Sequence, residues 1–148
     1  MAAALPADFR EFLRLLNSFG VEYLVVGGYA VGYYGYPRAT ADMDLWVRIA
    51  PENAERVAGA LRAFGFDMPA LSPGLFLRDN QIIRLGNPPF RIEIFTSVSG
   101  VEFSECYPSR VSARLDDVDV PLISLRDLKA NKRAAGRHKD LDDLEHLP

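Results

Sequence analysis

Residues 21–47 read VEYLVVGGYAVGYYGYPRATADMDLWV, and this stretch decides the fold. It begins with a short apolar run, residues 21–26, which is rich in β-branched side chains and ends in Gly27-Gly28. That pattern predicts a buried strand that enters a tight turn. Residues 42–47 then alternate in polarity with both acids on one side, which predicts a second strand with one buried face.

Asp42 and Asp44 stand two residues apart on this second strand. Side chains at that spacing project from the same face, with Cα atoms roughly 6–7 Å apart. Phosphoryl-transfer enzymes without a P-loop use such carboxylates to hold two Mg²⁺ ions about 3.5–4 Å apart. Close negative charges repel each other, and a bound cation removes that repulsion. The pair therefore indicates a metal site, although solvated carboxylates at a strand end would give the same pattern.

Glu93 is the candidate for a third carboxylate. The Asn-Pro-Pro run at residues 87–89 predicts a turn, and residues 90–95 alternate as a strand should. Residues 81–85 predict the strand before the turn, so that a hairpin places Glu93 on a sheet. On a strand next to residues 42–47, this side chain would supply the third metal ligand.

Gly27 and Gly28 close the first strand and open a short helix predicted at residues 29–34. Backbone N–H groups at such a turn can face a phosphate, and glycine permits its close approach. The alternative is that the two glycines only satisfy an unusual backbone angle at a strand-to-helix junction.

The rest of the chain completes an α/β or α+β fold, in one domain of residues 1–148, with a mixed sheet and helices packed mainly on one face. Asp8 and Glu11 predict an N-cap for the first helix, and Ser124 and Asp127 predict another. Further helices are predicted at residues 51–64 and from Asp140 onward, a strand pair is predicted around Asp116-Asp117, and residues 72–80 read only as a possible short helix.

Composition excludes several classes of protein. The chain has 148 residues, of which 49% are hydrophobic and 25% charged, and this is typical of a globular domain. The net charge of −3 excludes a globally basic nucleic-acid binder. Cys106 is the only cysteine, which excludes an intrachain disulfide and predicts a buried apolar side chain. No apolar run reaches a membrane span and no secretory signal begins the chain, so we expect a cytoplasmic protein.

A basic cluster follows Ser124. Arg126, Lys129, Lys132 and Arg133 share one predicted helical face, and Arg137 and Lys139 follow them. The plain interpretation is a solvated face that balances the acids of the last helix, Asp142, Asp143 and Glu145.

The motifs together resemble a known family. VVGGYA at residues 25–30 and RATADMDL at residues 38–45 resemble the glycine pair and acidic pair of the polymerase-β-like nucleotidyltransferase superfamily. The arrangement is similar to the small prokaryotic branch that includes abortive-infection type toxins. The likeness continues through RIEIFT at residues 91–96, LISLRDL at residues 122–128 and RHKDL at residues 137–141, so it spans most of the chain.

The resemblance implies the nucleotidyltransferase fold and transfer of a nucleoside monophosphate from a nucleoside triphosphate such as ATP to an acceptor hydroxyl, with release of pyrophosphate. Asp42 and Asp44 would bind two Mg²⁺ or Mn²⁺ ions, and Glu93 would complete one of them. Many relatives carry aspartate where Glu93 stands. The glycine pair, Gly27 and Gly28, would cradle the triphosphate. Lys132 would meet the triphosphate and steady the leaving pyrophosphate.

Several alternatives stay open from the sequence. The candidate acceptors are a tRNA end, a protein side chain, a small drug-like molecule and another nucleotide. One rival is a catalytically inactive protein of the same fold that acts as an antitoxin-like partner in a toxin–antitoxin pair. Another is a plain α/β scaffold that binds no divalent metal. Arg38 and Thr40 either orient phosphate or only lead into the strand, and the tyrosines near the glycine pair, Tyr29, Tyr33, Tyr34 and Tyr36, either stack on a base or pack a core.

Overall fold

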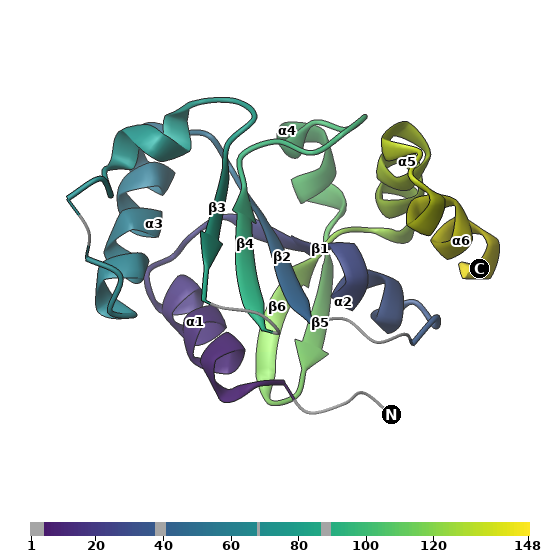
Figure 1. Ribbon diagram of the computed structural model, residues 1–148, viewed down its shortest axis with the longest axis horizontal. Helices are drawn as coiled ribbons and strands as arrows, with labels where there is room; N and C mark the ends of the chain where they lie inside the picture. The colour runs from purple at the N-terminus through teal and green to yellow at the C-terminus, as the bar shows by residue number, and fades with distance from the viewer. Residues whose placement is uncertain (1–4, 38–40, 68, 87–89) are drawn as a thin grey trace.

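A six-stranded mixed sheet forms the centre of the molecule (Figure 1). The structure, a computed structural model, describes residues 5–37, 41–67, 69–86 and 90–148. The strand order is β3-β4-β2-β1-β6-β5, with the β1/β6 and β2/β4 pairs parallel and the others antiparallel. The strands are β1 (Tyr23–Val26), β2 (Asp42–Val47), β3 (Ile82–Leu85), β4 (Arg91–Phe95), β5 (Val111–Leu115) and β6 (Val118–Leu122).

Six α-helices of the described residues accompany the sheet, and the α+β architecture with a mixed sheet expected from the sequence is confirmed. They are α1 (Ala7–Ser18), α2 (Gly27–Tyr33), α3 (Pro51–Ala63), α4 (Phe103–Cys106), α5 (Leu125–Ala135) and α6 (His138–His146). Short 3-10 turns occur at Pro73–Leu77 and Tyr107–Ser109. In Figure 1, α1 and α3 lie on one side of the sheet, whereas α2, α5 and α6 lie on the other. Among the described residues, no helix is both long and apolar enough to cross a bilayer.

The core explains why the strands alternate. Met43 and Leu45 of β2 pair in register with Ile92 and Ile94 of β4, and all four side chains are buried. Their neighbours along the strands project to the opposite face, where Asp44 stands beside Glu93. Burial of one face therefore fixes which face carries the acids.

Local signals at the helix ends were partly misleading. α1 begins at Ala7 after Pro6 and has no side-chain cap, so the predicted Asp8 cap is wrong. α6 begins at His138, two residues before the predicted start. The Ser124 cap of α5 is confirmed, because the Asp127 backbone N–H donates to Ser124 Oγ at 3.2 Å. The hairpin of β3 and β4 is also confirmed, whereas the Asn-Pro-Pro turn at residues 87–89 lies outside the described residues.

Candidate functional site

The three candidate acids lie on one face of two neighbouring strands. β2 and β4 run parallel, with Asp44 opposite Glu93 and Asp42 opposite Arg91. Because residues in register on adjacent strands project to the same side, the carboxylates of Asp42, Asp44 and Glu93 share a surface. The structure thus brings together the acids that the sequence pattern groups.

Two of these acids already have arginine partners. Arg84 Nε lies 2.7 Å from Glu93 Oε2, and Arg91 Nη2 lies 3.5 Å from Asp42 Oδ2. Within the described part of the chain, no three acidic, histidine or cysteine side chains are arranged to hold a metal ion. Glu93 and Asp42 are each engaged by an arginine here.

Asp44 has the most unusual environment of the three. Its Oδ1 atom is buried and has no hydrogen-bond partner within the described residues. Burial above all, and next the charge of Glu93, raise the pKa of Asp44 from 3.8 to about 7, against the opposing effect of Lys139. A buried carboxylate oxygen without a partner fits a divalent cation, and carboxylate oxygens are the ligands that Mg²⁺ and Mn²⁺ prefer.

Gly27 lies directly against Asp44. Its φ of +69° belongs to the left-handed region, and a Cβ atom at this position would stand 2.1 Å from Asp44 Oδ2. Either condition alone favours glycine, and both hold here. Gly28 follows, buried at the start of α2. The glycine pair therefore does more than turn the chain, because it leaves room for the acid.

A cleft of about 520 Å³ opens beside this contact. Its lining includes Gly27, Gly28 and Asp44 from the sheet edge and α2, and three cations, Lys132, Arg137 and Lys139. Asn80, Phe95 and Ser97 extend the lining along the sheet. Asp42 and Glu93 stand near the cleft on the same sheet face but do not line it. One candidate acid, Asp44, and three cations thus line a space open to a ligand.

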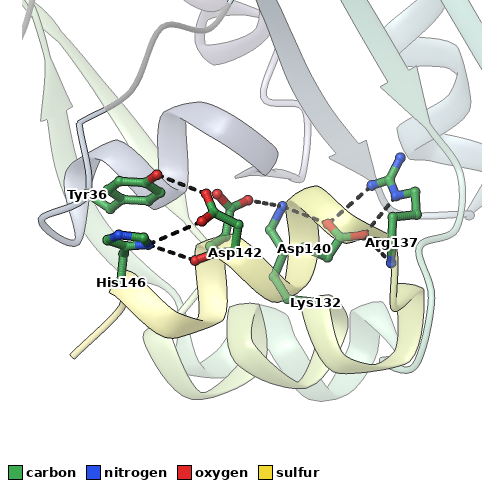
Figure 2. Close-up of polar contacts among 7 residues, drawn as sticks. Tyr36, Lys132, Arg137, Asp140, Asp142 and His146 are labelled. Atoms are coloured by element: carbon green, nitrogen blue, oxygen red, sulfur yellow. Dashed lines mark hydrogen bonds and ion pairs between the residues drawn. The ribbon is translucent and has the colours of Figure 1, made fainter.

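Lys132 lines the cleft, yet its ammonium group is buried and already paired with two carboxylates. The residue is 3% exposed, and its Nζ lies 3.1 Å from Asp140 Oδ1 and 3.0 Å from Asp143 Oδ2. Figure 2 shows Lys132 reaching from α5 to Asp140 on α6. The shared basic face is therefore wrong for Lys132, because Arg126 is exposed while Lys132 points inward.

The acids of α6 also divide into two sets. Asp143 is 1% exposed and pairs with Lys132, so a buried cation rather than a solvated basic face balances this acid. Asp142 and Glu145, by contrast, are exposed. The helix therefore buries Asp140 and Asp143 against Lys132 of α5 and leaves Asp142 and Glu145 exposed.

Arg137 and Lys139 are site residues to which the sequence reasoning gave no role. They flank His138, the first residue of α6, and line the same cleft as Gly27. Asp140 holds Arg137, since Arg137 Nε donates to Asp140 Oδ2 at 2.7 Å and the Arg137 backbone N–H donates to the same oxygen at 3.2 Å. Hydrogen bonding to Asp140 raises the pKa of Arg137. The signal was present in the basic run Arg137-His138-Lys139, which spans the start of α6 and directly precedes Asp140.

The four tyrosines do not line the cleft. Tyr29 packs edge-on against Phe9, and Tyr34 donates to the Ile123 carbonyl at 2.6 Å. Tyr36 stacks on His146 with ring centroids 4.0 Å apart (Figure 2). Their contacts favour packing over base stacking. Tyr33, which packs edge-on against Tyr34, is 45% exposed.

Two further expectations have plain outcomes. Cys106 is free and buried, as predicted, and burial raises its pKa to about 12, so its thiol is not poised for reaction. Arg38 and Thr40 lie outside the described residues.

Comparison with known proteins gives structural matches only. No protein-family model and no curated protein matches the chain, whereas eight chains of solved structures do. A Thermotoga maritima protein, provisionally described as a nucleotidyltransferase, aligns over 93% of this chain and 88% of its own, with a TM-score of 0.62 and 16% identity. A lincosamide antibiotic adenylyltransferase in its lincomycin-bound form aligns over 97% and 96%, with a TM-score of 0.59 and 14% identity.

A third solved structure agrees with these two. An antigenic nucleotidyltransferase-like protein of Paracoccidioides brasiliensis aligns over 97% of this chain and 77% of its own, with a TM-score of 0.55 and 20% identity. At such identities the likeness concerns the fold alone.

Proposed function

Because the chain has the nucleotidyltransferase fold that its sequence motifs predict, we propose that it transfers a nucleoside monophosphate from a nucleoside triphosphate to an acceptor hydroxyl. The observation that carries the proposal is the contact of Gly27 with Asp44 at the edge of the cleft. It brings a carboxylate with an oxygen lacking a partner against a turn that only glycine fits. Without a ligand for that oxygen, its burial would only destabilise the protein.

Asp42, Asp44 and Glu93 would hold the divalent metal, Mg²⁺ or Mn²⁺, with two ions in all. When bound, the metal neutralises charge on the attacking and leaving oxygens. Asp44 fits this role because its charged form is disfavoured in the metal-free protein and a cation would restore it. Arg84 and Arg91 would have to leave Glu93 and Asp42, and since both pairs are partly exposed, that release costs little.

The remaining side chains of the cleft suit a triphosphate. The lack of side chains at Gly27 and Gly28 lets the phosphates approach the backbone closely. Arg137 and Lys139, at the start of α6, line the same cleft, and their charge would balance the charge that grows on the leaving pyrophosphate. In the reaction the acceptor hydroxyl gives up its proton to solvent as its oxygen bonds to the α-phosphorus, the bond from that phosphorus to the bridging oxygen breaks, and pyrophosphate leaves.

Binding of nucleotide tests the proposal directly. A non-hydrolysable nucleoside triphosphate should be titrated calorimetrically, with Mg²⁺, into the wild type and into the double variant Asp42→Asn, Asp44→Asn. We expect metal-dependent binding in the wild type and a loss of at least tenfold in affinity in the variant. Absence of binding in both proteins would refute the proposal.

The inactive partner of a toxin–antitoxin type pair is the second candidate, and the arginine pairs of Glu93 and Asp42 favour it. In that case the arginines would neutralise the acids permanently. Thermal melting separates the two candidates, because Mg²⁺ or Mn²⁺ raises the melting temperature only if it binds the native state. A melting temperature that neither ion changes would support the inactive partner.

The acceptor can be sought once nucleotide binding is established. A triphosphate labelled at the α-phosphate should be incubated with RNA, with protein and with small hydroxyl compounds, in the cytoplasmic setting that we expect for the reaction. Transfer of the label to one class identifies the acceptor, and the Asp42→Asn, Asp44→Asn variant controls for contaminating activity.

A further inference from the structure

Three cations face the cleft from the α5–α6 junction, and their surroundings differ. Lys132 is buried between two carboxylates. The Arg137 side chain is 63% exposed, although Asp140 fixes its orientation. Lys139 is exposed and forms no hydrogen bond or ion pair with any described residue. The cation that resembles the family motif is therefore the one least able to reach a ligand.

The partners of Lys132 restrict what it can do. To contact a phosphate, its ammonium group would have to leave Asp140 or Asp143, and both of these side chains are buried. A buried carboxylate that loses its counterion is strongly disfavoured, so the ion pairs hold Lys132 in place. The same two contacts join α5 to α6.

Arg137 and Lys139 have the opposite character. Each lines the cleft that also contains Gly27 and Asp44. Arg137 uses Nε and Nη2 to bind Asp140 and has no described partner at Nη1. Both cations thus have donors left for an anion in the cleft.

We propose that Lys139 and Arg137 contact the triphosphate in this cleft, and that Lys132 is a positioning residue that holds α6 in place through Asp140 and Asp143. This inference rests on the proposed nucleotidyltransfer and replaces the role that the motif implies for Lys132. Asp140 connects the two functions, because it binds both Lys132 and Arg137.

Inorganic tripolyphosphate with Mg²⁺ is the probe, titrated calorimetrically into the full chain. We expect Lys139→Gln and Arg137→Gln each to raise the Kd roughly tenfold, as loss of a charged hydrogen bond should. Arg133→Gln is the matched control, since it removes an exposed charge from α5 outside the cleft, and its Kd should stay within about twofold of the wild type.

The role of Lys132 needs a variant that stays folded. Lys132→Met, Asp143→Asn removes one charge of each sign and leaves Asp140 with Arg137. We expect its Kd to stay within about threefold of the wild type and its salt dependence to be unchanged, whereas Lys139→Gln should bind with a shallower salt dependence because one direct ionic contact is gone. A folded double variant with a tenfold loss would overturn the positioning role.

The outcomes also separate this inference from the proposed function. Wild type that fails to bind tripolyphosphate overturns both. Wild type that binds, while Lys139→Gln and Arg137→Gln bind equally well, overturns this inference alone. If the Lys132→Met, Asp143→Asn variant does not fold, these two single variants still decide the question.

Discussion

The acids of the sheet and the acids of α6 differ in how their charges are compensated. Asp140 and Asp143 are buried, and both pair with Lys132. Asp44 is only half-buried, yet its Oδ1 atom has no partner among the described residues. Where the chain supplies its own counterion, the carboxylate holds helices together. Where it does not, the carboxylate is available to a ligand, and this contrast separates structural acids from candidate functional ones.

The largest expected effect tests the compensated side. Lys132→Met leaves Asp140 and Asp143 without their buried cation and should lower the free energy of unfolding by about 3–5 kcal/mol. Denaturant unfolding measures this, with Arg133→Met as an exposed control expected to change by less than about 0.5 kcal/mol. A loss below about 1 kcal/mol in Lys132→Met would show that the ion pairs are not structural.

Asp44→Asn tests the acid that lacks a counterion, and here we expect the free energy of unfolding to rise rather than fall. The pKa of Asp44 is raised from 3.8 to about 7, so the folded state holds this proton more tightly than the unfolded state. Its contribution to the free energy of unfolding is present below about pH 4 and lost as the pH rises to about 7. The metal-free variant should therefore match the wild type near pH 4 and exceed its stability by on the order of 2–4 kcal/mol at about pH 8.

Urea unfolding at the two pH values measures this difference. Addition of Mg²⁺ should reverse it, because the ion would stabilise the wild type more than the variant. An Asp44→Asn protein that is less stable than the wild type at the higher pH, without metal, would contradict the assignment of Asp44 to the uncompensated set.

Gly27→Ala should disturb the uncompensated acid through sterics. The new Cβ would meet Asp44 Oδ2, and the alanine would have to keep the positive φ of Gly27. We therefore expect a loss of about 1–3 kcal/mol in the free energy of unfolding and a loss of at least tenfold in metal-dependent nucleotide affinity. Gly32→Ala is the control in the same helix, because no atom lies within 4 Å of its added Cβ. Equal nucleotide affinities in the two variants would remove Gly27 from the site.

The smallest effect concerns the arginine on the edge strand. Arg84 is 55% exposed on its side chain, so Arg84→Gln should change stability by less than about 1 kcal/mol. Release of Glu93 should raise the affinity for Mn²⁺ a few-fold without nucleotide, as measured by calorimetry. Arg62→Gln, which removes a distant exposed pair with Asp67, should leave Mn²⁺ affinity unchanged. A weaker affinity in Arg84→Gln would show that the arginine supports the site.

Local patterns predicted the strands of the site but not the identity of its cations. β2 and β4 follow from alternation and from turn residues, so Asp42, Asp44 and Glu93 could be placed on strands. That β2 and β4 pair in parallel is a property of strand order, which no local pattern specifies. Burial of one face then fixed the shared register.

Lys132 shows why the roles of the cations could not be predicted from local sequence patterns. Its partners lie eight and eleven residues later in the sequence, on another helix, and only the packing of α6 against α5 turns its ammonium inward. Helical spacing alone grouped it with exposed arginines. α4 was missed for a simpler reason, because four residues are too few for a hydrophobic period.

The contacts of Tyr36 with Asp142 and His146 of α6 have a consequence for synthesis on the ribosome. Tyr36, near the segment that leads to Asp42, donates to Asp142 Oδ2 at 2.9 Å across a separation of 106 residues. At translation rates of about 5–20 residues per second, α6 is synthesised roughly 5–20 s after β2. Until then the nascent chain carries Asp42 and Asp44 without the cations of the α5–α6 junction that line the cleft. The complete cleft therefore forms only once translation has passed α6.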